Sequence, residues 1–268
     1  MSQTLYKFSG AGNDFVVLDG RGADMSRFRE PETIGALCKE YATDGLMILD
    51  TPKPVAGSTI DFSMEFFNPD GSGGMMCGNG GRCIVAFADM LGIRPSNGIT
   101  YGFLAPDGPH TATILEKGPR GWTVRLKMID VSGVEPIKGG YFLNTGTRHF
   151  VKFVENVEKV NVAEEGPVIR HDPAFAPIGT NVNFVHKAPD GLHVRTFEKG
   201  VEGETLACGT GITASALAAY HAGIINGNSI PLKARRDWLK VDFRPIDKCT
   251  FSDVYLTGPA TLILKDNA

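Results

Sequence analysis

The sequence has 268 residues, of which 42% are hydrophobic and 21% charged, a balance that predicts a large folded core and excludes a disordered chain. Its 30 acidic residues exceed its 27 Lys and Arg residues by three, so we expect no nucleic-acid partner. No apolar run is long enough for a transmembrane helix, so no membrane partner is expected, and no signal peptide is predicted. The five cysteines, an odd number, favour reduced thiols and a cytoplasmic protein.

The predicted elements form two series that resemble each other. Each series contains short strand-like runs and one helix-like run of small and aliphatic residues, and each helix-like run ends at a glycine, Gly92 or Gly223. Glycines and prolines cluster from Ser132 to Gly140, where we expect a domain boundary, giving domains 1–132 and 133–258. The strand-like runs, in chain order, are 13–17, 46–49, 60–67, 111–115, 122–128, 148–151, 182–186, 193–197 and 261–264.

The two helix-like runs begin alike. Cys77-Gly78-Asn79-Gly80 opens the first, and Cys208-Gly209-Thr210-Gly211 opens the second. A helix N-terminus has unpaired N–H groups and a partial positive charge, which stabilise a nearby anion and lower the pKa of a thiol. Glycines there allow an anion to approach the backbone. The pattern therefore predicts two reactive thiols, each beside an anion-binding helix start.

Other readings of these cysteines account for less of the pattern. A buried, inert thiol suits Cys38, Cys83 and Cys249, which do not precede a glycine-rich helix start. Zinc sites use two close ligand pairs, and the spacing here does not provide them, so we expect no metal. A hydrolase that pairs one cysteine with His149 would leave the second cysteine unexplained.

Two thiols suit the inversion of a stereocentre. If both helix starts face one cleft, one thiolate removes the proton from a carbon and the second thiol donates a proton to the opposite face. The helix N-termini would stabilise the charge that develops on the attached carboxylate. Such a reaction needs a small-molecule substrate with a weakly acidic α-proton, such as an amino acid.

Several segments resemble the diaminopimelate epimerase family. Segments 67–72 (FNPDGS) and 76–83 (MCGNGGRC) resemble its first cysteine signature, and 203–211 (GETLACGTG) resembles its second. Segments 10–15 (GAGNDF) and 179–182 (GTNV) resemble two further motifs, so that the resemblance spans almost the whole chain.

The resemblance implies a cytoplasmic, homodimeric enzyme that interconverts LL- and meso-2,6-diaminopimelate without a cofactor, on the route to lysine and peptidoglycan precursors. It implies an α/β fold of the α+β type: two similar domains, each a mixed sheet or barrel curled around a central helix, related by a pseudo-two-fold axis with the active site in the cleft. Residues 259–268 would return to the first domain.

The resemblance also implies roles for individual residues. Cys77 and Cys208 would be the base and acid, and His149 and Glu198 would support their ionisation. The residues implied to bind substrate, through side chains or backbone N–H groups, are Asn13, Asn68, Gly78, Asn79, Asn181, Glu198, Lys199, Gly209 and Thr210.

The sequence departs from the family pattern near the second signature. Lys199 stands where the family usually has arginine, Val201-Glu202 fills what is often one position, and Thr147 replaces an asparagine. Segment 43–45 also departs from the common form. Two alternative functions stay open: a cofactor-independent racemase of another amino acid, such as histidine or a proline derivative, and a binding protein that does not catalyse a reaction.

Overall fold

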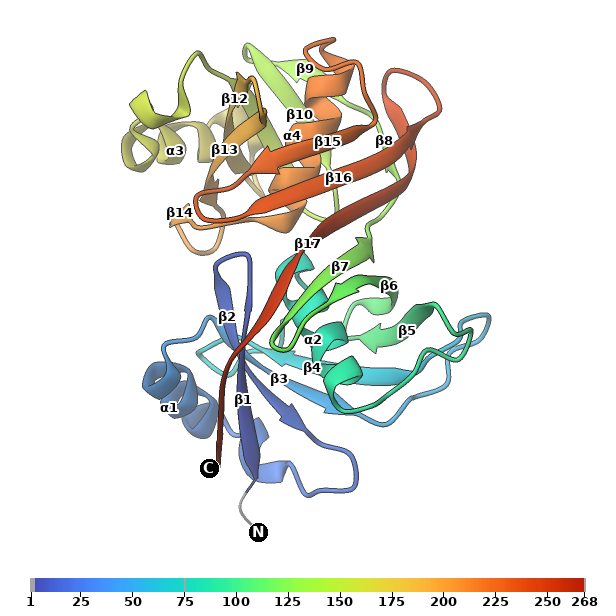
Figure 1. Ribbon diagram of the computed structural model, residues 1–268. Coiled ribbons are helices and arrows are strands. Elements are labelled where there is room, and N and C mark those ends of the chain that lie inside the picture. The colour runs from blue at the N-terminus through green and yellow to red at the C-terminus, as the bar shows by residue number, and fades with distance from the viewer. Residues whose placement is uncertain (1–2, 75, 268) are drawn as a thin grey trace. The chain divides into compact units, whose positions relative to one another are not determined.

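The computed structural model describes residues 3–74 and 76–267, which divide into two compact units (Figure 1). The first unit runs to Leu126 and takes up the chain again from Gly258, and the second comprises Lys127–Thr257. The segment from Ser132 to Gly140 lies within the second unit. No helix in the described part of the chain is long and apolar enough to cross a membrane.

The described residues of the first unit form eight strands, two α-helices and a short 3-10 helix. Its elements are β1 (Thr4–Gly10), β2 (Asn13–Asp19), η1 (Ser26–Arg29), α1 (Pro31–Tyr41), β3 (Gly45–Asp50), β4 (Phe62–Phe67), α2 (Gly78–Met90), β5 (Thr100–Ala105), β6 (Gly108–Lys117), β7 (Gly121–Lys127) and the second half of β17 (Thr250–Asn267).

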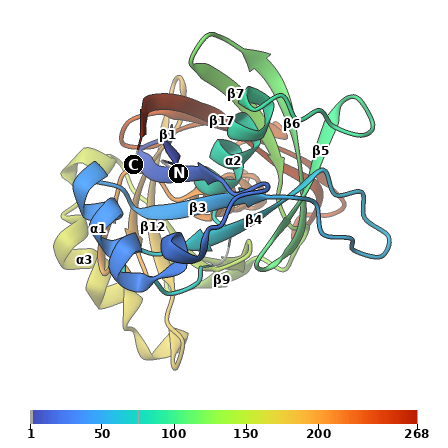
Figure 2. The same ribbon diagram turned by 90° about the horizontal axis from the view of Figure 1, so that it is seen from below.

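These strands form a closed barrel. From β1 to β7 each strand pairs with the next, and the pairings of β2 with β3 and of β4 with β5 are parallel whereas the others are antiparallel. The end of β17 then pairs with β7 on one side and with β1 on the other, which closes the circuit. Figure 2 shows α2 enclosed by these strands. The closing strand contains 261–264, so the return of the C-terminus to the first unit is observed.

The second unit repeats this plan. Its elements are β8 (Val131–Ser132), β9 (Glu135–Ile137), β10 (Gly140–Asn144), β11 (Arg148–Phe153), η2 (Val157–Lys159), α3 (Val162–Arg170), η3 (Pro173–Phe175), β12 (Asn181–Ala188), β13 (Gly191–Glu198), β14 (Gly203–Thr205), α4 (Gly209–His221), β15 (Ser229–Lys233), β16 (Trp238–Pro245) and the first half of β17.

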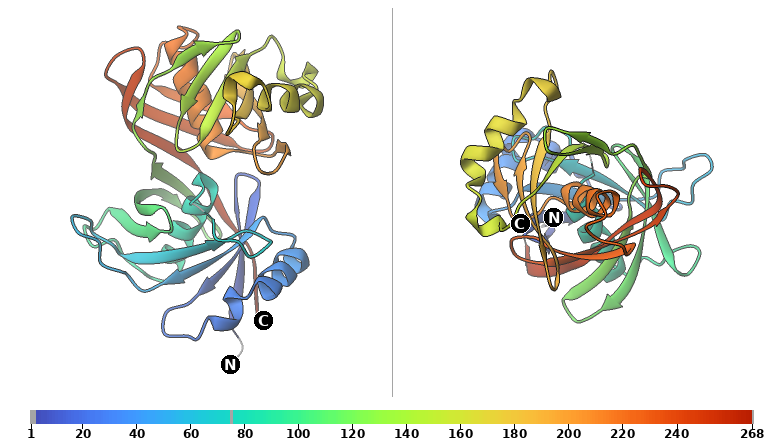
Figure 3. Two further views of the ribbon diagram at one scale, coloured as in Figure 1. Left: turned by 180° about the vertical axis from the view of Figure 1, so that it is seen from behind. Right: turned by 90° about the horizontal axis from the view of Figure 1, so that it is seen from above.

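The strand pairings of the second unit follow the same order as those of the first. From β10 through β11, β12, β13, β15 and β16 to β17, the second and fourth pairings are parallel and the rest antiparallel. The sheet curls around α4, which is orange in the right-hand view of Figure 3. These matching halves confirm the predicted fold class of two similar units, each a mixed sheet around a central helix.

Small side chains allow both central helices to be enclosed. All residues of α2 from Gly78 to Asp89 are buried, as is α4 from Gly211 to Ala219, where four of the nine residues are alanine. After a single C-cap residue, each helix is followed by a glycine with positive φ, Gly92 at 79° and Gly223 at 69°, a conformation that favours glycine and ends a helix. The predicted helices and their ends are therefore confirmed.

A buried carboxylate holds the C-terminal end of α2 in the first barrel. Asp89 accepts hydrogen bonds from the Trp122 indole (2.9 Å) and from Arg94 (3.1 Å), and it pairs with Lys117. Burial alone would raise the pKa of Asp89, but the hydrogen bonds from Lys117 and Trp122 and the charges of Lys117 and Arg94 outweigh it and lower the pKa. This network ties the helix to the strands around it.

We predict that Asp89→Asn lowers the free energy of unfolding by about 2 kcal/mol at pH 7, because a buried, charge-assisted network loses its charge. The carboxylate's contribution is present above its unfolded pKa of about 3.9 and is lost as the pH falls through its lower folded pKa. Urea denaturation checks this, with Asp130→Asn as the control, since Asp130 is exposed and pairs only at the surface with Lys127. Equal stability of the two variants would contradict the role of Asp89.

Candidate active site

The first cysteine caps the central helix of the first unit. Cys77 is half-buried at the N-cap of α2, and the backbone N–H of Gly80 donates to its Sγ at 3.2 Å. An N–H donor at a helix N-terminus stabilises a thiolate more than a thiol. The local geometry therefore favours the reactive form of this cysteine, as the sequence predicts.

A directed chain of side-chain hydrogen bonds crosses the first turn of α2. Asn79 donates from Nδ2 to Asn13 Oδ1, and Asn13 donates from Nδ2 to Asp44 Oδ2 at 3.2 Å. At the other end, Arg82 Nη2 donates to Asn79 Oδ1 at 2.8 Å. The chain of hydrogen bonds orients both asparagine amides.

Gly10 permits this close packing. A Cβ at Gly10 would lie 2.7 Å from the Asn79 carbonyl oxygen and 2.9 Å from Cys83 Sγ. Only a glycine at this position therefore lets the end of β1 come so close to the first turn of α2. The motif that contains Gly10 and Asn13 is thus built against the helix that Cys77 caps.

Asn68 shapes the loop that precedes this helix. Its Nδ2 donates to Ser72 Oγ at 3.0 Å, its backbone N–H donates to the Ser72 carbonyl at 2.9 Å, and its carbonyl accepts from Gly71. The turn in the first cysteine signature is therefore closed by its own residues. A role for Asn68 in binding substrate stays a prediction.

The second cysteine caps the central helix of the second unit. Cys208 is buried at the N-cap of α4, and its Sγ lies 3.4 Å from Thr210 Oγ1. The Thr210 hydroxyl in turn lies 2.9 Å from His149 Nε2. Thr210, predicted to act through its backbone N–H, therefore also links the imidazole to the sulfur through its side chain.

The hydrogen bonds of His149 define its tautomer. Asn183 Nδ2 donates to the Phe150 carbonyl and lies 3.0 Å from His149 Nδ1, and Asn183 Oδ1 accepts from the Thr196 hydroxyl. Nδ1 must then accept, so Nε2 carries the proton and donates to the hydroxyl of Thr210 or Thr147. Complete burial lowers the pKa of His149 to about 3. The ring is a neutral donor at physiological pH.

The start of β12 lies beside this group. Asn181 Nδ2 donates to the Arg148 carbonyl (2.9 Å) and to Thr147 Oγ1 (3.3 Å), while its Oδ1 accepts from the backbone N–H of Lys199 at 2.8 Å. Asn181 thus joins the strand that carries His149 to the loop after Glu198. The structure brings His149, Asn181, Lys199 and Thr210 together at one edge of the second unit.

The loop after Glu198, where the sequence departs from the family pattern, is held in place by α3. Glu202, with a φ of 55°, donates its N–H to the Glu198 carbonyl and accepts from Gly200 N–H (3.0 Å) and from Arg170 (3.2 Å). The Gly200 N–H and the Arg170 guanidinium hold the pKa of Glu202 below its usual range. The extra residue therefore has a structural place, because its carboxylate attaches the loop to α3.

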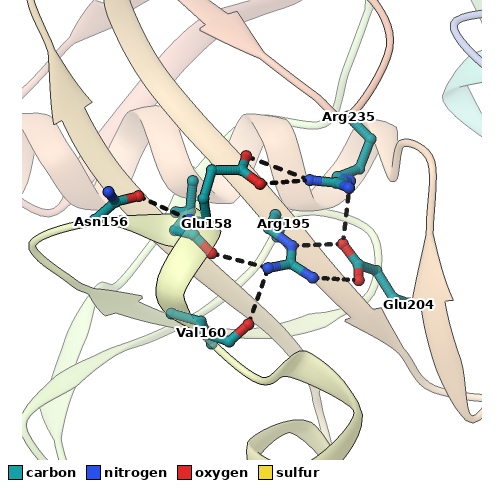
Figure 4. Close-up of polar contacts among 7 residues, drawn as sticks. Asn156, Glu158, Val160, Arg195, Glu204 and Arg235 are labelled. Carbon is teal, nitrogen blue, oxygen red and sulfur yellow. Dashed lines mark hydrogen bonds and ion pairs between the residues drawn. The ribbon is translucent and has the colours of Figure 1, made fainter.

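An ion network positions the segment that leads to Cys208 (Figure 4). Arg195 forms a two-bond pair with Glu204 (2.7 and 2.6 Å) and donates to the carbonyls of Val157 and Val160, both at 2.9 Å. Arg235 approaches Glu204 at 3.5 Å and Glu158 at 3.1 Å. The sequence analysis did not predict this network, because Glu158 and Arg235 are far from Arg195 in the chain and all four residues resemble ordinary surface charges.

Comparison with known proteins agrees with the two signatures. The family model for diaminopimelate epimerase matches residues 141–263. A diaminopimelate epimerase of Flavobacterium psychrophilum is 39% identical, with 97% of this chain and 98% of that protein covered. One of Chlorobaculum tepidum is 40% identical, with 96% and 98% covered.

The chain belongs to the diaminopimelate epimerase family. It is an isomerase. A crystal structure of a hydroxyproline epimerase from Agrobacterium vitis has the same fold, with a TM-score of 0.66 at 15% identity over 100% of this chain and 91% of that one. Both units of this chain have a cysteine at the N-cap of the central helix.

We predict that nitrogen-15 NMR finds His149 as the neutral Nε2–H tautomer at every pH from about 5 to 8, because its folded-state pKa of about 3 lies below that range. In denaturing urea the same residue should titrate near 6.5. Because the folded pKa is the lower one, His149 reduces stability as the pH falls below about 6.5. A folded-state titration midpoint above 5 would contradict this assignment.

Proposed function

We propose that this protein interconverts LL- and meso-2,6-diaminopimelate by deprotonating and reprotonating Cα with Cys77 and Cys208. One thiolate removes the α-hydrogen as a proton, and the other thiol donates its proton to the opposite face of the same carbon. One proton leaves the carbon and one arrives, so no oxidant and no cofactor is required. The observation that carries the proposal is the pair of cysteines at matching helix N-caps in two matching units.

The helix starts supply the electrostatic part of the mechanism. Removal of the α-proton turns the substrate carboxylate into an enediolate with additional negative charge. The backbone N–H groups of Gly78, Asn79, Gly209 and Thr210 would donate to it, and each helix adds about half a positive charge at its N-terminus. These donors are already oriented toward the carboxylate. They therefore stabilise the transition state, in which the carboxylate gains negative charge, more than they stabilise the ground state.

The remaining predicted residues would support the two cysteines or bind the substrate. Neutral His149 would hold the Thr210 hydroxyl beside Cys208 Sγ, and Glu198 would face the same edge of the second unit. Asn13, Asn68, Asn181, Glu198 and Lys199 would bind the substrate, several of them at the distal amino acid centre. We further infer a homodimer and a cytoplasmic place on the route to lysine and peptidoglycan precursors.

We predict that Cys77→Ala and Cys208→Ala each lower the rate of LL-to-meso conversion at least about 10²-fold, since each removes an acid or base from the transition state. Chiral chromatography of the product, under reducing conditions and without pyridoxal phosphate, measures the rate. Cys249→Ala, which changes a thiol at the far end of α4 near His221, is the control and should retain wild-type activity.

The proposal fails if either helix-capping variant keeps more than a tenth of wild-type activity. Conversion of another amino acid but not of diaminopimelate would keep the two-thiol chemistry and replace the substrate. Binding of diaminopimelate without any conversion would leave the non-catalytic binding protein as the better account.

A second prediction concerns the distal carboxylate. Lys199→Ala should raise KM for LL-diaminopimelate about tenfold with little change in kcat, because the side chain contributes a charge to binding and not to the reacting carbon. Lys199→Arg should restore or lower KM, since arginine can bond a carboxylate through two parallel N–H groups. Lys39→Ala is the matched control. An unchanged KM in Lys199→Ala would remove Lys199 from the binding residues.

A further inference from the structure

Arg82 is a buried cation that the proposed chemistry leaves without a role. Arg82 belongs to α2, and its side chain is the largest among the fully buried side chains of the described residues. Its guanidinium donates to the Gly78 carbonyl (3.1 Å), to Asn79 Oδ1 (2.8 Å) and to the Pro259 carbonyl (3.3 Å). A guanidinium does not lose its proton in proteins, so this end of the helix carries a permanent positive charge.

The second unit has a neutral residue in the same place. Thr213 follows Cys208 at the distance in sequence at which Arg82 follows Cys77, and its hydroxyl donates to the Gly209 carbonyl at 3.0 Å. Arg82 satisfies the equivalent carbonyl, that of Gly78, in the first unit. The two helix starts therefore have the same hydrogen bond, made by a cation in one and by an uncharged hydroxyl in the other.

The other charged groups around the start of α2 are already bonded. Lys7 from β1 pairs with Asp14 from β2 at 2.9 Å, and Asp44 before β3 accepts from Asn13 and from the Asp14 N–H. Asp107 before β6 accepts from the Met76 N–H and lies 3.2 Å from His110. Within the helix, burial raises the pKa of the Cys83 thiol strongly, so Cys83 stays protonated.

Around the start of α4, the side chains that hydrogen-bond to His149 carry no positive charge in the described residues, and Lys199 joins this group through its backbone N–H. His149 from β11 is neutral, and Asn183 from β12 and Thr196 from β13 are uncharged. Electrostatics therefore favour an anion at the first cysteine over one at the second.

We propose that Arg82 keeps Cys77 as the thiolate of the pair in the resting protein, with Cys208 as the thiol. This inference rests on the two-thiol function proposed above. Cys77 takes the α-proton and Cys208 gives its own, so the two change places in one turnover. Cys208 then regains a proton from solvent and Cys77 loses one, which restores the resting state without net change in protons. Arg82 acts through Cys77 and the Asn79 amide and does not touch the substrate.

The test is site-resolved alkylation without substrate. The reduced protein is treated briefly with iodoacetamide at a series of pH values, and peptide mass spectrometry measures the rate at Cys77 and Cys208 separately. The midpoint of each rate–pH curve is compared, because it reports ionisation, whereas the maximal rate also reports access. In wild type, the midpoint for Cys77 should lie below that for Cys208.

Three variants separate charge from packing. Arg82→Met should raise the Cys77 midpoint by about one pH unit or more, and so slow alkylation at neutral pH about tenfold. Arg82→Lys retains the charge and should restore most of that shift. Thr213→Val, the matched change in the second unit, should leave the Cys77 midpoint unchanged.

Several results would overturn the proposal. They are an unchanged Cys77 midpoint in Arg82→Met, an equal shift in Arg82→Lys, and a wild-type Cys77 midpoint at or above that of Cys208. If Arg82→Met does not fold, the wild-type comparison and Arg82→Lys decide. Alkylation needs no substrate, so the expected midpoints without epimerase activity would refute only the proposed function, and the reverse result would refute only the role of Arg82.

Discussion

The arrangement on which the rest of this structure depends is a cysteine sulfur at the N-terminus of a buried helix. Neither Cys77 nor Cys208 would be especially reactive as a thiol without its helix. In the proposed function, each would gain its reactivity from the backbone N–H groups of a helix start and from a helix dipole that water would screen on an exposed helix. Burial of the helix is thus the condition for reactivity, and a curled sheet is a way to bury a helix on nearly all sides.

The surrounding structure holds each helix start in place. In the first unit the final strand closes the barrel, Asp89 secures the far end of α2, and Arg82 orients Asn79. In the second unit the Arg195–Glu204 pair positions the segment before Cys208. Gly211 has a similar part, since a Cβ there would lie 2.3 Å from Asn183 Oδ1 and would displace the amide that orients His149. The same fold therefore provides both the burial and the precision that the chemistry requires.

Local patterns in the sequence predicted much of this. The repeated Cys-Gly-x-Gly, the alanine-rich helix and the terminal glycines Gly92 and Gly223 are short-range signals, and the structure confirms the helices they predict. The contacts of Arg82, Thr147 and Arg195 were not predicted. Some of their partners, such as Pro259 for Arg82, lie far away in the chain and are brought near only by the fold. A charged residue inside a small-residue helix was the one local sign that Arg82 is unusual.

The central claim is that two separate groups act on the two faces of one carbon. The direct measurement is the position of deuterium after brief reaction of LL-diaminopimelate in D₂O. The account predicts that the meso product carries deuterium at the inverted centre while recovered LL substrate retains protium, because the thiol that donates has exchanged with solvent and the thiol that removes the proton returns it unexchanged. Deuterium appearing in recovered substrate as fast as in product, or protium carried over into the product, would show that one group serves both faces and would contradict the account.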